Sequence, residues 1–128
     1  AGTIDMCKNE LGLNIISSAN IIQDIAGKWT EKQLESHLIA GEKLKEILEE
    51  TFDFIGSNIH WKLTEFDIAE FIRGKFDRYE LETDHGPVVA VNQNSSLPHY
   101  EPKEETSSII TRNSWLLIDL WAKTKTEN

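Results

Sequence analysis

Apolar positions recur every three or four residues over two stretches of the chain, which is the spacing of one face of an α-helix. The first stretch predicts a helix over about 31–58, with the apolar positions Ala40, Leu44, Ile47, Leu48, Phe52 and Ile55. The second predicts a helix over about 65–80, with the apolar stripe Ile68, Phe71, Ile72, Phe76 and Tyr79. We expect the two amphipathic helices to pack against a shared apolar surface.

Both predicted helices begin with a capping box, in which a hydroxyl and a side chain three residues later satisfy free N–H groups reciprocally. Thr30 is followed in this way by Gln33. Thr64 is followed in the same way by Asp67. The two pairs therefore place the helix starts at about residues 31 and 65.

Two strands are predicted in the second half of the chain. Residues 87–91 are β-branched and bounded by glycine and asparagine, and residues 114–122 are apolar. The polar, proline-containing stretch 92–106 between them is predicted as a loop, and the tail 123–128 as a turn or a frayed end. Two long helices followed by strands indicate an α+β fold rather than a doubly wound sheet.

The first 27 residues have a different pattern. Residues 3–27 carry two short apolar clusters, and we expect a helix–strand–helix segment there. Its second helix should start at Ser17 or Ser18 and run through about Ala26. We therefore expect residues 1–27 to form a junction from a preceding domain and residues 28–128 to form the main domain.

Charge and cysteine content narrow the class of protein. The net charge is −9, from 22 acidic and 13 basic residues, which disfavours nucleic acid and anionic lipid as partners. Cys7 is the single cysteine, so no intrachain disulfide can form. No apolar run approaches the roughly 20 residues that span a bilayer, so we expect no membrane segment and a cytoplasmic protein.

Asp119 is the first candidate for chemistry. Strand alternation places Asp119 with Leu117 and Trp121 on one face of its strand, so we expect a carboxylate among large apolar side chains. A buried carboxylate needs a cation, a metal ion or several hydrogen-bond donors. The simpler alternative is a strand-end aspartate that pairs with a nearby N–H group or lysine.

His99 is the second candidate. It lies in the loop between the two strands, flanked by Pro98, Tyr100 and Glu101. Loops at strand ends often carry functional groups. A lone loop histidine is also common as a plain surface residue, and His37 and His60 are read as surface residues too.

These residues belong to a longer motif that resembles the aminopeptidase P and prolidase-like enzymes of the pita-bread metallopeptidases. The resemblance is carried by residues 83–92 leading into Pro98-His99-Tyr100-Glu101-Pro102, and by the strand around Asp119. Residues 17–20 and 29–34 also resemble the interdomain junction and first catalytic helix of that subgroup. Gly86 departs from the pattern, because a second proline is expected there.

The resemblance implies a specific fold and chemistry. The chain would be the first half of a pita-bread catalytic domain, with two long helices on antiparallel strands. The family holds two divalent metal ions, usually manganese, cobalt or zinc, that generate a hydroxide for attack on a peptide bond, often one before proline. By the same resemblance, Asp119 would be a bridging metal ligand. His99 would be a non-ligand histidine that contacts the peptide substrate and its reaction intermediate.

Counting ligands limits what this chain can do alone. The resemblance implies two aspartates, a histidine and two glutamates as ligands, and Asp119 is the only one of them that we find before Asn128. Hard divalent ions prefer about six ligands. We therefore expect the chain alone to bind no dimetal centre and to be inactive.

A half-domain would also leave apolar surface exposed, and large exposed apolar patches favour association. We therefore expect a homodimer through the surface around Val88–Val91, Trp115 and Trp121.

Two other functions stay open. Relatives with this fold have lost their metals and bind peptides or proteins, so the chain could be a metal-free binding module. A creatinase-like hydrolase acting on a non-peptide amide is the other alternative.

Overall fold

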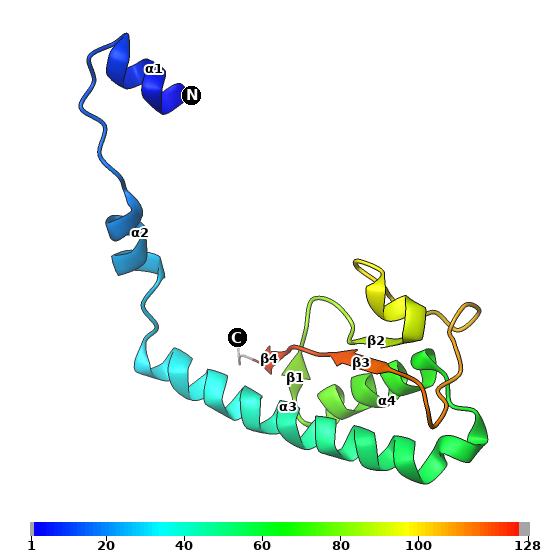
Figure 1. The fold of residues 1–128 in the computed structure, drawn as a ribbon. Coiled ribbons are helices and arrows are strands. Elements are labelled where there is room, and N and C mark those ends of the chain that lie inside the picture. The colour runs from blue at the N-terminus through cyan, green and yellow to red at the C-terminus, as the bar shows by residue number, and fades with distance from the viewer. Residues whose placement is uncertain (1, 126–128) are drawn as a thin grey trace. The chain divides into compact units, whose positions relative to one another are not determined.

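The computed structural model describes residues 2–125, and the chain divides into two compact units, Ala1–Gln33 and Leu34–Asn128. Figure 1 shows the elements in chain order. The helices are α1 (Thr3–Asn9), α2 (Ala19–Ala26), α3 (Glu31–Asn58) and α4 (Glu65–Arg78). The strands are β1 (Leu81–Glu82), β2 (Val88–Val91), β3 (Leu116–Asp119) and β4 (Lys123–Thr124), and short 3₁₀ helices cover Ile59–Trp61 and Asn92–Ser96. The fold is α+β, as predicted.

The first unit contains two short helices with their apolar side chains exposed. The predicted second helix is confirmed as α2, with Ser18 as its N-cap residue. The Ser17 hydroxyl also accepts a hydrogen bond from the Ala19 N–H at 3.1 Å. The predicted strand between the helices is wrong, because residues 11–18 take no regular structure. An apolar run becomes a strand only where another strand pairs with it.

Helix α3 spans the predicted residues, and its capping box is present. The Thr30 N–H donates to the Gln33 side chain at 2.8 Å, and the Gln33 N–H donates to the Thr30 hydroxyl at 3.2 Å. The buried face is centred on Ala40, Ile47, Thr51 and Ile55. Phe52, which the apolar pattern assigned to this face, is 52% exposed. Because Thr51 continues the four-residue spacing from Ile47, Phe52 points about 100° away from the core.

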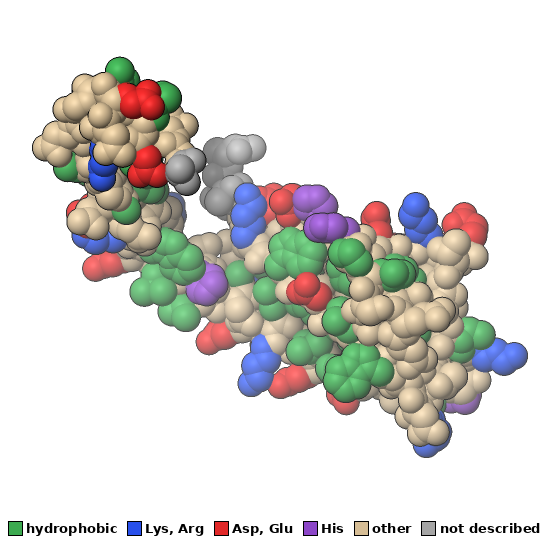
Figure 2. All heavy atoms as spheres, turned by 45° about the horizontal axis from the view of Figure 1, so that its top comes forward, with side chains coloured by type: hydrophobic (Ala, Val, Ile, Leu, Met, Phe, Trp, Pro, Cys, Tyr) green, Lys and Arg blue, Asp and Glu red, His purple; other side chains and the backbone are tan. Residues whose placement is uncertain are grey.

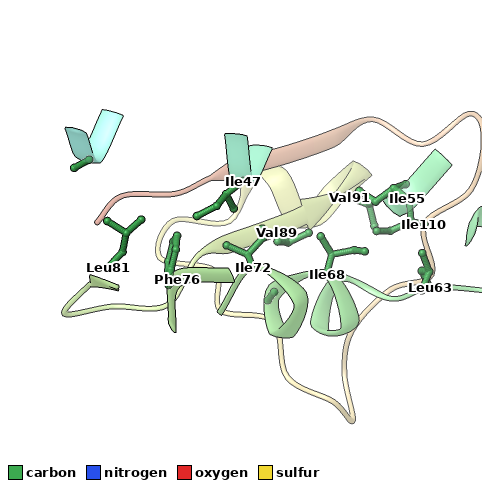
Figure 3. Close-up of a cluster of buried hydrophobic side chains, with 12 residues drawn as sticks. Ile47, Ile55, Leu63, Ile68, Ile72, Phe76, Leu81, Val89, Val91 and Ile110 are labelled. Atoms are coloured by element: carbon green, nitrogen blue, oxygen red, sulfur yellow. The ribbon is translucent and has the colours of Figure 1, made fainter. Parts of the chain in front are cut away.

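The core lies where α3, α4 and β2 meet. Figure 3 shows Ile68, Ile72 and Phe76 of α4 directed toward the side chains of β2 and α3. The β2 residues in this cluster are Val89 and Val91, both at most 1% exposed. The capping box of α4 is also confirmed, because Thr64 and Asp67 exchange hydrogen bonds of 2.8 and 3.2 Å. The shared apolar surface predicted for the two helices is therefore present.

The strands form two antiparallel pairs. β2 pairs with β3, in the register Val88↔Asp119 and Val91↔Leu116. The predicted strand 87–91 is thus confirmed, whereas the one predicted over 114–122 is shorter. The tail prediction is wrong at Lys123–Thr124, because these residues form β4 and pair with β1. Two-residue strands leave no local pattern, and residues 126–128 of the predicted tail lie outside the described residues.

Candidate functional site

A pocket of about 270 Å³ opens on the face of β2 and β3 that points away from the core. Alternation along the paired strands sends Val89, Val91, Leu116 and Ile118 to the core and leaves the other side chains on the open face. The apolar wall of the pocket consists of Val88, Ala90, Leu97, Leu117 and Trp121. Asp119 and His99 line the same pocket. The structure thus brings together the two side chains that the sequence singled out.

Asp119 lies at the end of β3, directly opposite Val88. The alternation predicted for its strand is correct, but its side chain is exposed rather than buried. The prediction that apolar neighbours enclose Asp119 is therefore wrong for the described residues. Leu117 is half-buried and Trp121 is 39% exposed, so these neighbours form an open surface that leaves the carboxylate accessible.

His99 sits at a tight bend of the loop that follows the 3₁₀ helix Asn92–Ser96. Its backbone is left-handed, with φ of 56°, a conformation that is uncommon for residues other than glycine. The imidazole is exposed while it lines the pocket. The exposure of His99 agrees with the interpretation that it is a plain surface residue. Its place in the same pocket as Asp119 agrees with the interpretation that it has a functional role. His37 and His60 are exposed on or beside α3, as predicted.

The loop that carries His99 is held in place by hydrogen bonds to Glu65, a residue that the sequence analysis did not single out. Glu65, the first residue of α4, is fully buried, with 0% exposure. Its Oε1 accepts hydrogen bonds from the Val91 N–H at 2.6 Å and the Asn94 amide at 3.0 Å. Its Oε2 accepts from the Tyr100 hydroxyl at 2.6 Å and the Ser108 N–H at 2.8 Å. Neutral donors thus replace the water that this carboxylate loses on burial.

Tyr100 links this buried cluster to the pocket, because it follows His99 directly and lines the pocket itself. Burial, with the hydrogen bond to Glu65 as the next cause, raises the pKa of Tyr100 to about 12. Both effects disfavour a phenolate beside an existing carboxylate. The hydroxyl therefore stays a hydrogen-bond donor to Glu65 across the physiological pH range.

Trp121 is held on the other side of the pocket by the turn before β2. Its indole N–H donates to Asp84 Oδ1 at 3.3 Å. This bond is the first cause that lowers the pKa of Asp84, and the neighbouring His85 is the second. Gly86 in the same turn leaves room for Arg73, because a Cβ atom there would lie 2.6 Å from a guanidinium nitrogen. This nitrogen is the far end of a flexible side chain, so the contact does not by itself account for the departure from proline.

Residues 2–125 contain no group of three or more histidine, cysteine, aspartate or glutamate side chains that could hold a metal ion. Glu104 and Glu105 are exposed on the loop after Pro102. Among the described residues that line the pocket, Asp119 carries the one carboxylate. Figure 2 shows apolar side chains gathered on one face of the unit that contains the strands, with charged side chains and histidines among them.

Comparison with known families decides what the chain is. The model of metallopeptidase family M24 matches residues 35–127. The chain belongs to metallopeptidase family M24. Its resemblance to the pita-bread metallopeptidases is thereby confirmed. A search of curated proteins finds none that matches.

Membership in family M24 implies the pita-bread fold and suggests peptidase activity. The family generally binds divalent metal ions. The matched region includes α4, the strands and the loop of His99, whereas α1 and α2 lie before it. Within the described residues, no helix is long and apolar enough to cross a membrane.

Proposed function

We propose that this M24 chain forms one wall of the active site of a dimetal peptidase that cleaves the bond before proline. It would act in the manner of Xaa-Pro aminopeptidases and dipeptidases. The observation that carries the proposal is the pocket in which His99 and Asp119 meet on the open face of β2 and β3. The motif around His99 supports the preference for proline.

The roles of the two polar side chains follow from their chemistry. An exposed carboxylate at the end of a strand is a suitable ligand for a hard divalent ion, and Asp119 offers two oxygens. The His99 imidazole can donate a hydrogen bond to the substrate carbonyl oxygen, where negative charge develops during attack. The apolar wall of Val88, Leu117 and Trp121 would contact the proline ring and its neighbour.

The described residues do not fit a complete dimetal centre by themselves. Among residues 2–125, Asp119 has no second and third ligand near it. When bound, such metal ions supply an activated water molecule at neutral pH. We therefore propose that the remaining ligands come from outside the described residues and that residues 1–128 alone are inactive.

The test is hydrolysis of Ala-Pro and Ala-Ala dipeptides with Mn²⁺, Co²⁺ or Zn²⁺ by the full product of the gene that encodes this chain. We expect metal-dependent cleavage that favours Ala-Pro. His99→Ala should lower kcat/KM on the order of a hundredfold, as the loss of one donor to a developing oxyanion does. Asp119→Asn should abolish metal-dependent activity. His60→Ala should have no effect, because His60 is exposed and does not line the pocket.

Other results would favour the two alternatives. Binding of Ala-Pro peptides without hydrolysis under any metal would indicate a metal-free binding module. Hydrolysis of creatine with no cleavage of dipeptides would indicate a creatinase-like enzyme. Equal cleavage of Ala-Pro and Ala-Ala would overturn the proline preference and leave a general peptidase.

A further inference from the structure

The buried cluster of Glu65 has an unusual distribution of partners. Its donors Val91, Asn94, Tyr100 and Ser108 all belong to the segment 91–108. They lie at the start, the middle and the end of that segment. A single carboxylate on α4 therefore holds the segment 91–108 at several points between β2 and the β-bridge that pairs Thr64 with Ile109.

The direction of Glu65 follows from its place on α4. It lies three, four and seven residues before Ile68, Ala69 and Ile72, so it continues their buried face toward the helix start. The Thr64 capping box fixes that start. A carboxylate in the first turn is also stabilised by the positive end of the helix dipole. Glu65 is thus held in place by α4 and presents both oxygens to the segment 91–108.

The fastening reaches His99 through its neighbour. Tyr100 bonds to Glu65 through its hydroxyl, and the backbone turns through the left-handed conformation at His99. A left-handed residue other than glycine persists where the surrounding structure holds it. The position of the imidazole therefore depends on an anchor one residue away that is itself bonded to Glu65.

We propose that Glu65 is the positioning residue of this site: its buried carboxylate fixes the segment that carries His99 and so sets where the imidazole lies in the pocket. The proposal rests on the proposed function in one respect, that His99 is the group that meets the substrate. Glu65 itself does not line the pocket.

The first experiment needs no substrate. In the labelled chain of residues 1–128, NMR follows the imidazole signals of His99 and the amide exchange of Val91 and Ser108. Glu65→Gln keeps the side-chain shape but replaces one acceptor oxygen with a donor. We expect amide exchange at Val91 or Ser108 to accelerate about tenfold, as the loss of one hydrogen bond predicts, and the His99 signals to shift. The methyl signals of Ile47 and Ile72 should stay in place.

Glu70→Gln is the matched control, because Glu70 is exposed on the same helix and bonds to Arg73. It should change neither the His99 signals nor the two amides. Unchanged His99 signals in Glu65→Gln would overturn the proposal. A uniform shift that includes the core methyl groups would also overturn it, because Glu65 would then support the fold as a whole.

Tyr100→Phe decides the question if Glu65→Gln does not fold. It removes one hydroxyl donor and leaves the carboxylate with the other three donors. A shift of the His99 signals with unchanged core methyl signals would support the proposal. Unchanged His99 signals in this variant would overturn it.

The second experiment tests the link to catalysis with a double-mutant cycle in the active gene product. Glu65→Gln should lower kcat about tenfold with a smaller change in KM, as misplacement of a catalytic group does. Glu65→Gln combined with His99→Ala should be no slower than His99→Ala alone. Additive losses would overturn the proposal. Absence of any hydrolysis would contradict the proposed function. The NMR experiment would still test whether Glu65 positions His99, because it needs no substrate.

Discussion

Two carboxylates near the β2–β3 pair have opposite surroundings. Glu65, at the start of α4, is fully buried and bonded to four donor groups. Asp119 is on the open side, exposed at the end of β3. The difference separates two uses of the same chemical group. A carboxylate surrounded by donors fixes a loop, whereas an exposed one remains available to an external cation.

The largest expected effect is on stability. Glu65→Ala should reduce the free energy of unfolding by about 3 kcal/mol, because buried donors lose their acceptor and a cavity opens. Urea denaturation followed by circular dichroism measures this loss. Glu70→Ala on the same helix is the control and should stay within about 0.5 kcal/mol of the wild type. A loss of similar size in both variants would remove the distinction between buried and exposed carboxylates.

Self-association would sharpen the comparison, since it would cover the open side. The open surface expected around Val88–Val91 is wrong at Val89, Ala90 and Val91, which are at most 1% exposed. We predict a homodimer through the face that carries Trp115, which is 71% exposed, and Trp121, which is 39% exposed. Trp115→Ser should weaken dimerisation by more than about tenfold, as loss of an aromatic anchor does. Trp61→Ser is the control, because Trp61 is 69% exposed outside the strands. Sedimentation that shows a monomer throughout the micromolar range would contradict the prediction.

Tyr100→Phe should have a smaller effect on stability. It removes one hydrogen bond to Glu65, which contributes about 1 kcal/mol. The pKa of Tyr100 is about 12 in the folded chain against an ordinary value of 10.0. Its contribution is therefore complete below pH 10 and is lost as the pH rises toward 12.

Urea midpoints measured at pH 8, 10 and 11.5 test this window. The difference between wild type and Tyr100→Phe should shrink with rising pH, because only the wild type has this phenol to ionise. Lysines and Tyr79 also titrate in this pH range, but both proteins contain them. Their effect on stability therefore cancels in the difference between wild type and Tyr100→Phe. A difference that stays constant from pH 8 to 11.5 would contradict the prediction.

The smallest expected effect is at Asp119. Asp119→Asn should change the free energy of unfolding by less than about 0.5 kcal/mol, as surface substitutions do. Isothermal titration of residues 1–128 with Mn²⁺ should give no tight, stoichiometric binding, because one carboxylate falls far short of about six ligands. Tight binding that Asp119→Asn abolishes would show that this chain completes the metal site by itself.

The candidate site was only partly predictable. The motif around His99 and the alternation at Asp119 selected two side chains that do line one pocket. Glu65 was missed, although it continues the apolar face of Ile68 and Ile72 back toward the helix start. A polar residue on an apolar face is a usable signal, but its partners Asn94 and Ser108 are 29 and 43 residues away.

The sequence by itself determined the helices. The bounds of α2 and α3 and the start of α4 follow from apolar spacing and capping pairs, which involve residues within one or two turns of each other. It also determined the alternation of side chains along β3, but not which of the two faces turns inward. Local interactions suffice for these features, because the atoms that stabilise them are close along the chain.

Only the tertiary structure decided which carboxylate is buried and where the short strands pair. β1 and β4 are two residues each and meet across more than 40 positions, through Leu81↔Thr124. Burial of Glu65 requires donors from distant loop residues, whereas Asp119, at the end of β3, stays exposed. Desolvation depends on what covers a side chain in space, and the residues next to it in the sequence do not determine that.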